Sequence, residues 1–197
     1  MAAQRARRAG RSIDPAELGE LSRRLRPAVA RSTALARFDE LFRSGQPPTS
    51  SPSGFRPGRL LTTSIWGPAD RGALRLADAW MPWKGKSFDP DAATGVNRFD
   101  RSVLRPSRVL WPGYRPESVA GERVEMFPFR TRLAPGAIDP EVTVLKIDYD
   151  FEANPGFMIR RILDEVVEVA PGVLLGKILF RARGRFHPIG FFSLSEP

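Results

Sequence analysis

The stretch VTVLKIDY, residues 142–149, is the clearest strand signal in the chain and sets the fold class. Apolar and polar residues alternate there, and successive side chains of a strand point to opposite faces. The more apolar face carries Leu145, Ile147 and Tyr149, so we expect Tyr149 to point inward. The other face carries Lys146, Asp148 and Asp150. We interpret it as solvent-exposed, with the inside of a barrel as the alternative.

Similar runs follow on both sides of this strand. Residues 59–66, 97–103, 124–133, 166–169, 173–181 and 189–194 all favour strands, and the turn signals Pro171-Gly172 and Arg183-Gly184-Arg185 separate the last three. Open sheet edges invite aggregation, so a sheet of six to eight strands tends to close. The sequence therefore predicts a mainly β (α+β) fold: a small antiparallel barrel or a strongly curved sheet. One or two short helices are expected, at 68–80 and 157–163.

The first fifty residues differ in composition and pattern from the strand-rich part of the chain. Residues 1–11 are predicted to be a disordered basic tail, and 12–45 an N-terminal helical arm that begins at Asp14-Pro15. Its two helices carry apolar stripes, and we expect them to pack on the domain: Leu18, Leu21 and Leu25, then Leu35, Phe38, Leu41 and Phe42. Residues 46–53 are rich in proline and serine and predict a linker. The β-rich core domain is expected at 54–197.

Composition excludes several kinds of site. The chain has no cysteine, which rules out disulfides and thiolate ligands, and its single histidine, His187, rules out a multi-histidine metal site. His187 lies beside Pro188 and is interpreted as structural rather than as a haem ligand. We therefore expect no metal and no cofactor. A net charge of +9 comes partly from the basic tail, which argues against nucleic-acid binding.

Hydropathy bears on location. The sequence has no uncharged apolar run long enough to cross a membrane and no signal-like segment near its start. We expect a cytoplasmic, bacterial type of protein.

Residues 80–89, WMPWKGKSFD, carry the densest aromatic signal. Trp80, Trp83 and Phe88 predict either core packing or the wall of a pocket. Lys84 and Lys86 flank Gly85, and a regular strand would place both lysines on one face, where they would hold an anionic head group. A solvated strand face is the alternative.

Acidic residues give the candidates for catalysis. Asp148 and Asp150, with Tyr149 between them, would supply acid–base chemistry if they faced a cavity. The cluster Asp164, Glu165 and Glu168, which follows Arg160 and Arg161, is interpreted as surface ion pairs.

Two segments resemble a known family. Gly54-Phe55-Arg56-Pro57-Gly58 has the spacing of the motif that names the GXWXG proteins, with Arg56 at the tryptophan position. Residues 83–88, WKGKSF, and 97–99, NRF, are similar to a second element of that family. Further matches at 149–150, 164, 175–177 and 191–194 resemble the companion domain of unknown function 4334. The resemblance implies a compact, calycin-like, strand-rich architecture and no assigned reaction.

Three functions follow as hypotheses. The first is non-catalytic binding of a small apolar or amphipathic molecule in the barrel by Trp80, Trp83, Phe88 and Tyr149, with Lys84 or Lys86 as the partner of an anionic group. The second is a cofactor-independent enzyme, such as a cyclase or isomerase, that uses Asp148, Asp150 or Tyr149 in the same cavity. The third is a partner-binding scaffold in which the helical arm docks elsewhere.

Overall fold

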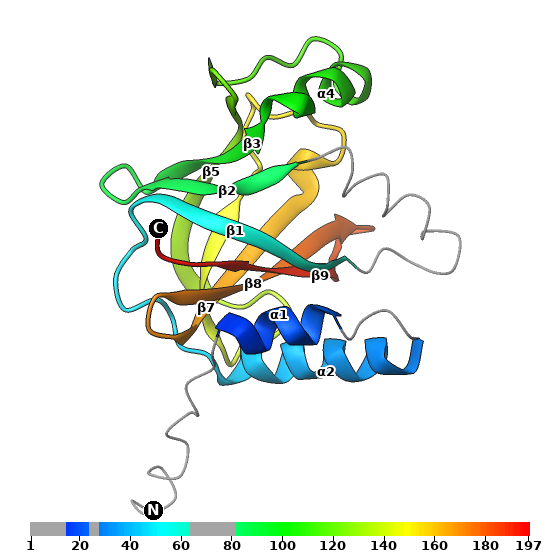
Figure 1. The fold of residues 1–197 in the computed structure, drawn as a ribbon, viewed down its shortest axis with the longest axis vertical. Coiled ribbons are helices and arrows are strands. Elements are labelled where there is room, and N and C mark those ends of the chain that lie inside the picture. Colours follow the sequence, from blue (N-terminus) through cyan, green and yellow to red (C-terminus); the bar gives the residue numbers. More distant parts are fainter. Residues whose placement is uncertain (1–14, 24–27, 64–81) are drawn as a thin grey trace, which may run out of the picture.

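The computed structural model describes residues 15–23, 28–63 and 82–197 (Figure 1). The predicted basic tail, the predicted helix at 68–80 and Trp80 lie outside these ranges, as do the side chains of Leu21 and Leu25. The described helices are α1 (Pro15–Arg23), α2 (Ala28–Ser44) and α4 (Leu104–Leu110), with 3-10 turns at Arg101–Val103 and Ile159–Arg161.

Nine strands are described after the first two helices. They are β1 (Gly54–Thr63), β2 (Trp83–Asp89), β3 (Thr94–Asp100), β4 (Ser118–Ala120), β5 (Arg123–Pro135), β6 (Thr143–Asp148), β7 (Ile162–Ala170), β8 (Val173–Ala182) and β9 (Arg185–Leu194). Every pairing is antiparallel.

The sheet closes on itself as an up-and-down barrel. Its strand order is β3-β2-β1-β9-β8-β7-β6-β5-β4, and the additional pairing of β3 with β5 joins the two ends. The short β4 pairs with residues 123–125 of β5, beside the stretch that pairs with β6. Closure leaves the eight main strands without a free edge. The prediction of a mainly β fold with an antiparallel barrel is confirmed.

Two tight turns connect the last three strands as expected. Gly172, between β7 and β8, has a φ of +72°, and Arg183 and Gly184, between β8 and β9, have φ values of +48° and +77°. Two successive positive φ angles are typical of the hairpin turn whose twist matches that of the strands.

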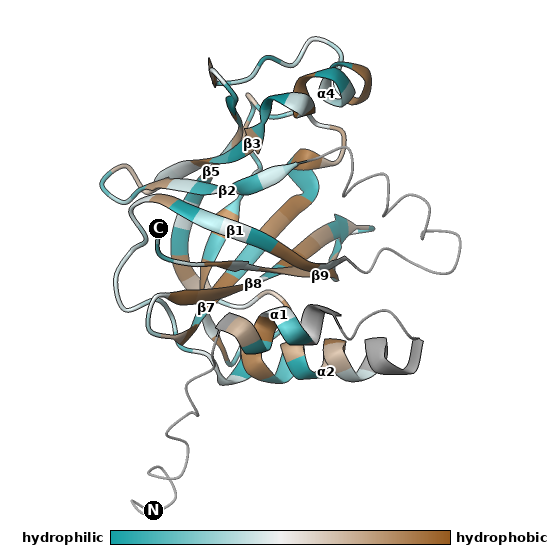
Figure 2. Cartoon of the chain, viewed as in Figure 1, coloured by the Kyte–Doolittle hydropathy of each residue, from teal (hydrophilic) through white to brown (hydrophobic). Residues whose placement is uncertain are grey.

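Apolar residues form two separate cores. The inside of the barrel and its α4 end hold one core, which includes Phe88, Phe129, Ile147 and Phe192. The second core lies outside the barrel, where α1 and α2 cover one side of it, beneath β7, β8 and β9 (Figure 1). Brown, hydrophobic stretches mark α2 and the strands above it in Figure 2. Phe38 and Phe42 of α2 are fully buried, and Phe38 stacks on Phe191 at 5.4 Å.

A β-bulge in β2 changes the faces of its side chains. Trp83 pairs with Phe99 and Gly85 with Arg98, so one extra residue of β2 is accommodated at this point, and Gly85 adopts a φ of +141°. Lys84 consequently points outward and is exposed, whereas Lys86 is 3% exposed. The expectation that both lysines share one face is wrong, because it assumed a regular strand.

Replacement of Gly85 by alanine is expected to lower the free energy of unfolding by at least about 3 kcal/mol. A Cβ atom at this position would lie 2.1 Å from the carbonyl oxygen of Arg56, on a backbone conformation that L residues rarely adopt. Gly121→Ala is the matched control: its φ is also positive, at +58°, but its Cβ would meet nothing within 4 Å, so it should cost only about 1 kcal/mol. Urea denaturation measures both, and equal costs would contradict the close approach of β1 and β2.

Candidate functional site inside the barrel

Four polar side chains from separate segments meet inside the barrel. Lys86 comes from β2, Asn97 from β3, Tyr149 directly follows β6, and Asp164 comes from β7. Each is at most 5% exposed. Burial of a polar group is costly unless it finds hydrogen-bond partners, so these four side chains need partners inside the barrel.

The four side chains of this polar cluster form hydrogen bonds with one another in a continuous network. The Lys86 ammonium donates to Oδ1 of Asn97 at 2.9 Å, to the Tyr149 hydroxyl, and to Oδ2 of Asp164 at 2.9 Å. Nδ2 of Asn97 donates to the same hydroxyl at 3.1 Å. Tyr149 therefore accepts twice and uses its own proton to donate to Oδ2 of Asp164 at 3.0 Å.

Neighbouring groups hold Asn97 in place. Its Nδ2 also donates to the carbonyl of Phe127 at 3.2 Å, and the Trp83 indole donates to its Oδ1 at 3.1 Å. Phe127 is itself the extra residue of a second bulge, in β5, and has a φ of +58°. Bulges re-aim side chains and backbone groups, and this one directs a carbonyl to the network.

Aromatic rings surround the ammonium. Nζ of Lys86 lies between 5.1 and 5.4 Å from the ring centroids of Trp83, Phe129, Tyr149 and Phe192. A cation at this distance is attracted by the electron-rich ring faces. The rings also exclude water from the ion pair between Lys86 and Asp164.

Burial shifts the pKa values of two members. Loss of hydration lowers the pKa of Lys86, although the nearby Asp164 carboxylate acts in the opposite direction. Burial, together with the Asp164 charge, raises the pKa of Tyr149 well above its usual value. Tyr149 is therefore a phenol, not a phenolate, at neutral pH. One cation and one anion give the cluster no net charge.

The structure brings together several of the residues predicted from sequence. Trp83, Lys86 and Tyr149 are in contact, and Phe88 joins them through Phe129, whose ring lies 5.4 Å from Phe88 and 5.6 Å from Tyr149. Lys84 lies outside the barrel, 3.9 Å from Asp100. Trp80 lies outside the described residues.

The candidate acids are arranged differently. Asp148 pairs with Arg132 at 3.0 Å, and Asp150 pairs with Arg160 and Arg181, all on the outer surface, as the alternation of residues 142–149 indicates. The interpretation of Asp164 and Glu165 as surface ion pairs is wrong: they are 4% and 0% exposed. Asp164 faces inward, whereas Glu165 lies on the outer face and accepts from the backbone N–H of Ala137 at 2.7 Å. In the sequence, the only feature that could indicate a buried acid is the strand-like pattern of residues 162–170. Alternation along a strand places one of two adjacent acids inside the barrel.

The two family-like motifs lie side by side. In β1 and β2, Pro57 pairs with Gly85, and a Cβ on Gly58 would come within 2.3 Å of the Trp83 ring. The glycines thus let Trp83 and the bulge pack tightly against β1, which positions Lys86 toward the barrel interior.

Comparisons with known proteins do not assign a function to this chain. No family model matches the chain, and no curated protein matches it. A solved crystal structure of a protein from Thermomonospora curvata is similar at 18% sequence identity and a TM-score of 0.49, covering 90% of this chain and 99% of that one. Function therefore has to be inferred from the side chains of this chain.

Two searches of the described ranges were negative. Within residues 15–23, 28–63 and 82–197, no group of three or more histidine or acidic side chains is placed to hold a metal ion. None of the helices in those ranges is long and apolar enough to span a membrane.

Proposed function

We propose that this protein binds a small apolar or amphipathic molecule inside its barrel, without catalysing a reaction. The observation that supports the proposal is the Lys86 ammonium, held in a cage of four aromatic rings at the centre of the barrel. A buried ion pair contributes little net stability compared with apolar residues of similar size. A role in recognition gives a reason for a charged group at this position.

The charge of the cluster indicates the polar group of the ligand. Lys86 already has a carboxylate partner in Asp164, at 2.9 Å. A second carboxylate would lie beside that anion in a medium of low dielectric constant, which is unfavourable. All three N–H groups of the Lys86 ammonium already have acceptors, so a ligand oxygen has to take the place of one of them. A hydroxyl or carbonyl oxygen can do so without adding charge. We therefore propose a ligand with an apolar body and a neutral oxygen, in place of the anionic head group expected from sequence.

Matched ligands and matched variants test this proposal. Isothermal titration with 1-decanol and with decanoate should give a dissociation constant at least tenfold lower for the alcohol. The double variant Lys86→Met/Asp164→Asn removes both charges at similar volume and should abolish this preference. Lys84→Met, two residues away on the outer face, should bind as the natural chain does. Equal binding of both ligands, or no binding of either, would count against the proposal.

The contact of Tyr149 with Asp164 also supports a second candidate, a cofactor-independent enzyme. The hydroxyl donates to the carboxylate at 3.0 Å, so Asp164 has a hydrogen-bonded phenol beside it and would act as the base. This version moves the acid–base role from Asp148 and Asp150 to Asp164. The two functions differ in the fate of the ligand, because binding alone releases it chemically unchanged.

The resemblance to the GXWXG proteins stays a prediction. Its implication of a calycin-like barrel is compatible with a binding function, and it assigns no reaction.

A further inference from the structure

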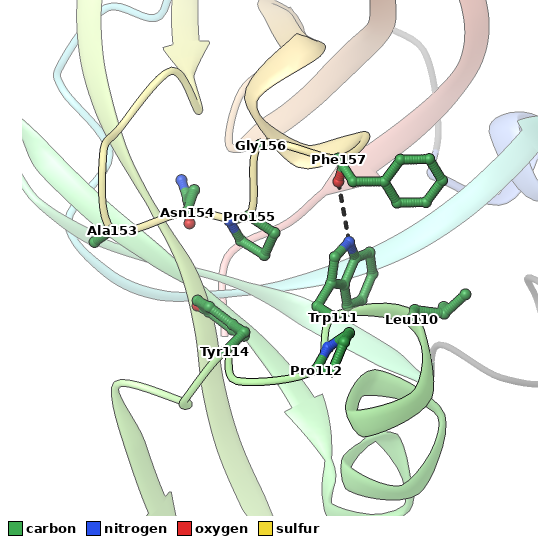
Figure 3. A pocket seen from close by; sticks show the side chains of 9 residues that line it. All are labelled: Leu110, Trp111, Pro112, Tyr114, Ala153, Asn154, Pro155, Gly156 and Phe157. Atoms are coloured by element: carbon green, nitrogen blue, oxygen red, sulfur yellow. Dashed lines mark hydrogen bonds between the residues drawn. The ribbon is translucent and has the colours of Figure 1, made fainter.

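A pocket of about 370 Å³ lies at the α4 end of the barrel, between the residues that follow α4 and the segment after β6. Figure 3 shows its lining, with Asn154 and Tyr114 on one side and Leu110 and Phe157 on the other. Phe127 contacts both regions: its ring packs against two lining residues of the pocket, and its carbonyl accepts from Asn97 of the polar cluster. It packs edge-on against Trp111 at 5.1 Å and stacks on Tyr114 at 5.2 Å.

Asn154 carries a buried acceptor without a partner. Its side chain is 3% exposed, and Nδ2 donates to the carbonyls of Pro128 at 2.7 Å and Tyr149 at 2.9 Å. Two carbonyls on one side fix the orientation of the amide, because only its NH₂ group can donate to them. Oδ1 therefore faces away from these carbonyls, and within the described part of the chain no group donates a hydrogen bond to it. An unpaired buried acceptor is costly, and a ligand donor would remove that cost.

The other polar groups of the pocket are uncharged. The Tyr114 hydroxyl accepts from the backbone N–H of Phe127 at 2.7 Å, and burial raises the pKa of Tyr114 to about 12. It therefore keeps its proton at neutral pH and can donate. The Trp111 indole N–H is already bonded to the carbonyl of Phe157 at 3.0 Å (dashed line in Figure 3). All nine lining residues are uncharged, so the pocket favours a neutral molecule.

We infer that this pocket is a second ligand site, for a small neutral aromatic molecule that carries an O–H or N–H donor. The ring packs among Trp111, Tyr114 and Pro155, and the donor bonds to Oδ1 of Asn154. This atom is covered in the structure, so the lining side chains have to shift to admit the donor. Phe157, which is 65% exposed, lies at the outer side and would be covered by the bound ring. This site does not depend on ligand binding inside the barrel.

Phenol and anisole form a matched pair of probes, because they share a ring and only phenol has a donor. Titration of ¹⁵N-labelled protein should shift the Trp111 indole N–H and the Asn154 side-chain amide signals. We expect phenol to bind at least tenfold more tightly than anisole. Equal affinities would overturn the role of Asn154, and shifts confined to the Trp83 indole would overturn the location.

Two variants complete the test. Gly156 lines the pocket, and a Cβ there would meet nothing within 4 Å, so Gly156→Leu should fold and occupy the space. It should weaken phenol binding more than tenfold, whereas unchanged binding would overturn the site. Lys86→Met/Asp164→Asn should keep phenol binding, which separates this inference from the function proposed for the barrel. Loss of phenol binding in that variant would place the probe inside the barrel and overturn the second site.

Discussion

Lys86→Met is expected to lower the free energy of unfolding by about 3–5 kcal/mol. The substitution keeps the apolar stem but leaves the Asp164 carboxylate buried without its cation, at a site where Lys86 Nζ now lies 2.9 Å away. The ring cage limits the access of water that could replace the ammonium. Adding Asp164→Asn should restore most of the loss, because no unpaired charge then remains. Chemical denaturation of the two single variants and the double variant measures the coupling between the residues.

The pH dependence gives an independent check of the same pair. Burial lowers the pKa of Lys86, so between its folded and its unfolded pKa the unfolded chain binds the extra proton. The contribution of Lys86 to the free energy of unfolding should therefore rise with pH across that window, below the ordinary lysine pKa. The double variant should lack this rise. A natural chain whose pH profile matches that of the double variant in this range would contradict the buried position of Lys86.

Lys177→Met should cost a similar amount, about 3–5 kcal/mol, but at the junction of the helical arm and the barrel. Lys177 is 1% exposed and pairs with Asp139 at 2.7 Å and with Asp39 of α2 at 2.8 Å. Its Nζ also lies 4.3 Å from the centroid of the Phe42 ring. Without the ammonium, Arg43, at 2.7 Å, is the only cation among the described residues that still pairs with Asp139. We therefore expect α2 to become susceptible to limited proteolysis before the barrel does.

Arg37→Met is the matched control on the same helix. Arg37 forms an exposed ion pair with Glu40 at 2.8 Å, which should contribute less than about 1 kcal/mol. A loss of stability in Arg37→Met as large as that in Lys177→Met would show that helix propensity, not the buried junction, dominates.

The loss of stability at low pH tests the same junction independently. Burial raises the pKa of Asp139, but the hydrogen bonds from Lys177 and Arg43 outweigh that effect and lower it overall. This part of the stability is lost as pH falls through the folded pKa.

The sequence by itself determined the strand alternation, the turns and the apolar stripe of the arm. Residues 142–149 alternate because one face of a barrel strand is inside and the other outside, and Tyr149 accordingly points inward. Gly172 and Gly184 mark turns because a positive φ costs glycine little. Phe38, Leu41 and Phe42 lie on one side of a helix and are buried together. All of these signals are local, and a period or a turn residue is sufficient to identify them.

Only the tertiary structure decided the site. The bulge before Gly85 turns Lys86 inward and leaves Lys84 in solvent, because it adds one residue to β2, which a period of two does not reveal. Asp164 resembles a surface acid in sequence, since its partners come from other segments: Lys86 from β2 and Tyr149 from the residues directly after β6. A charged side chain is buried only where such partners meet it. Strand pairing around the closed barrel therefore determines whether that position holds a surface charge or a buried, paired charge.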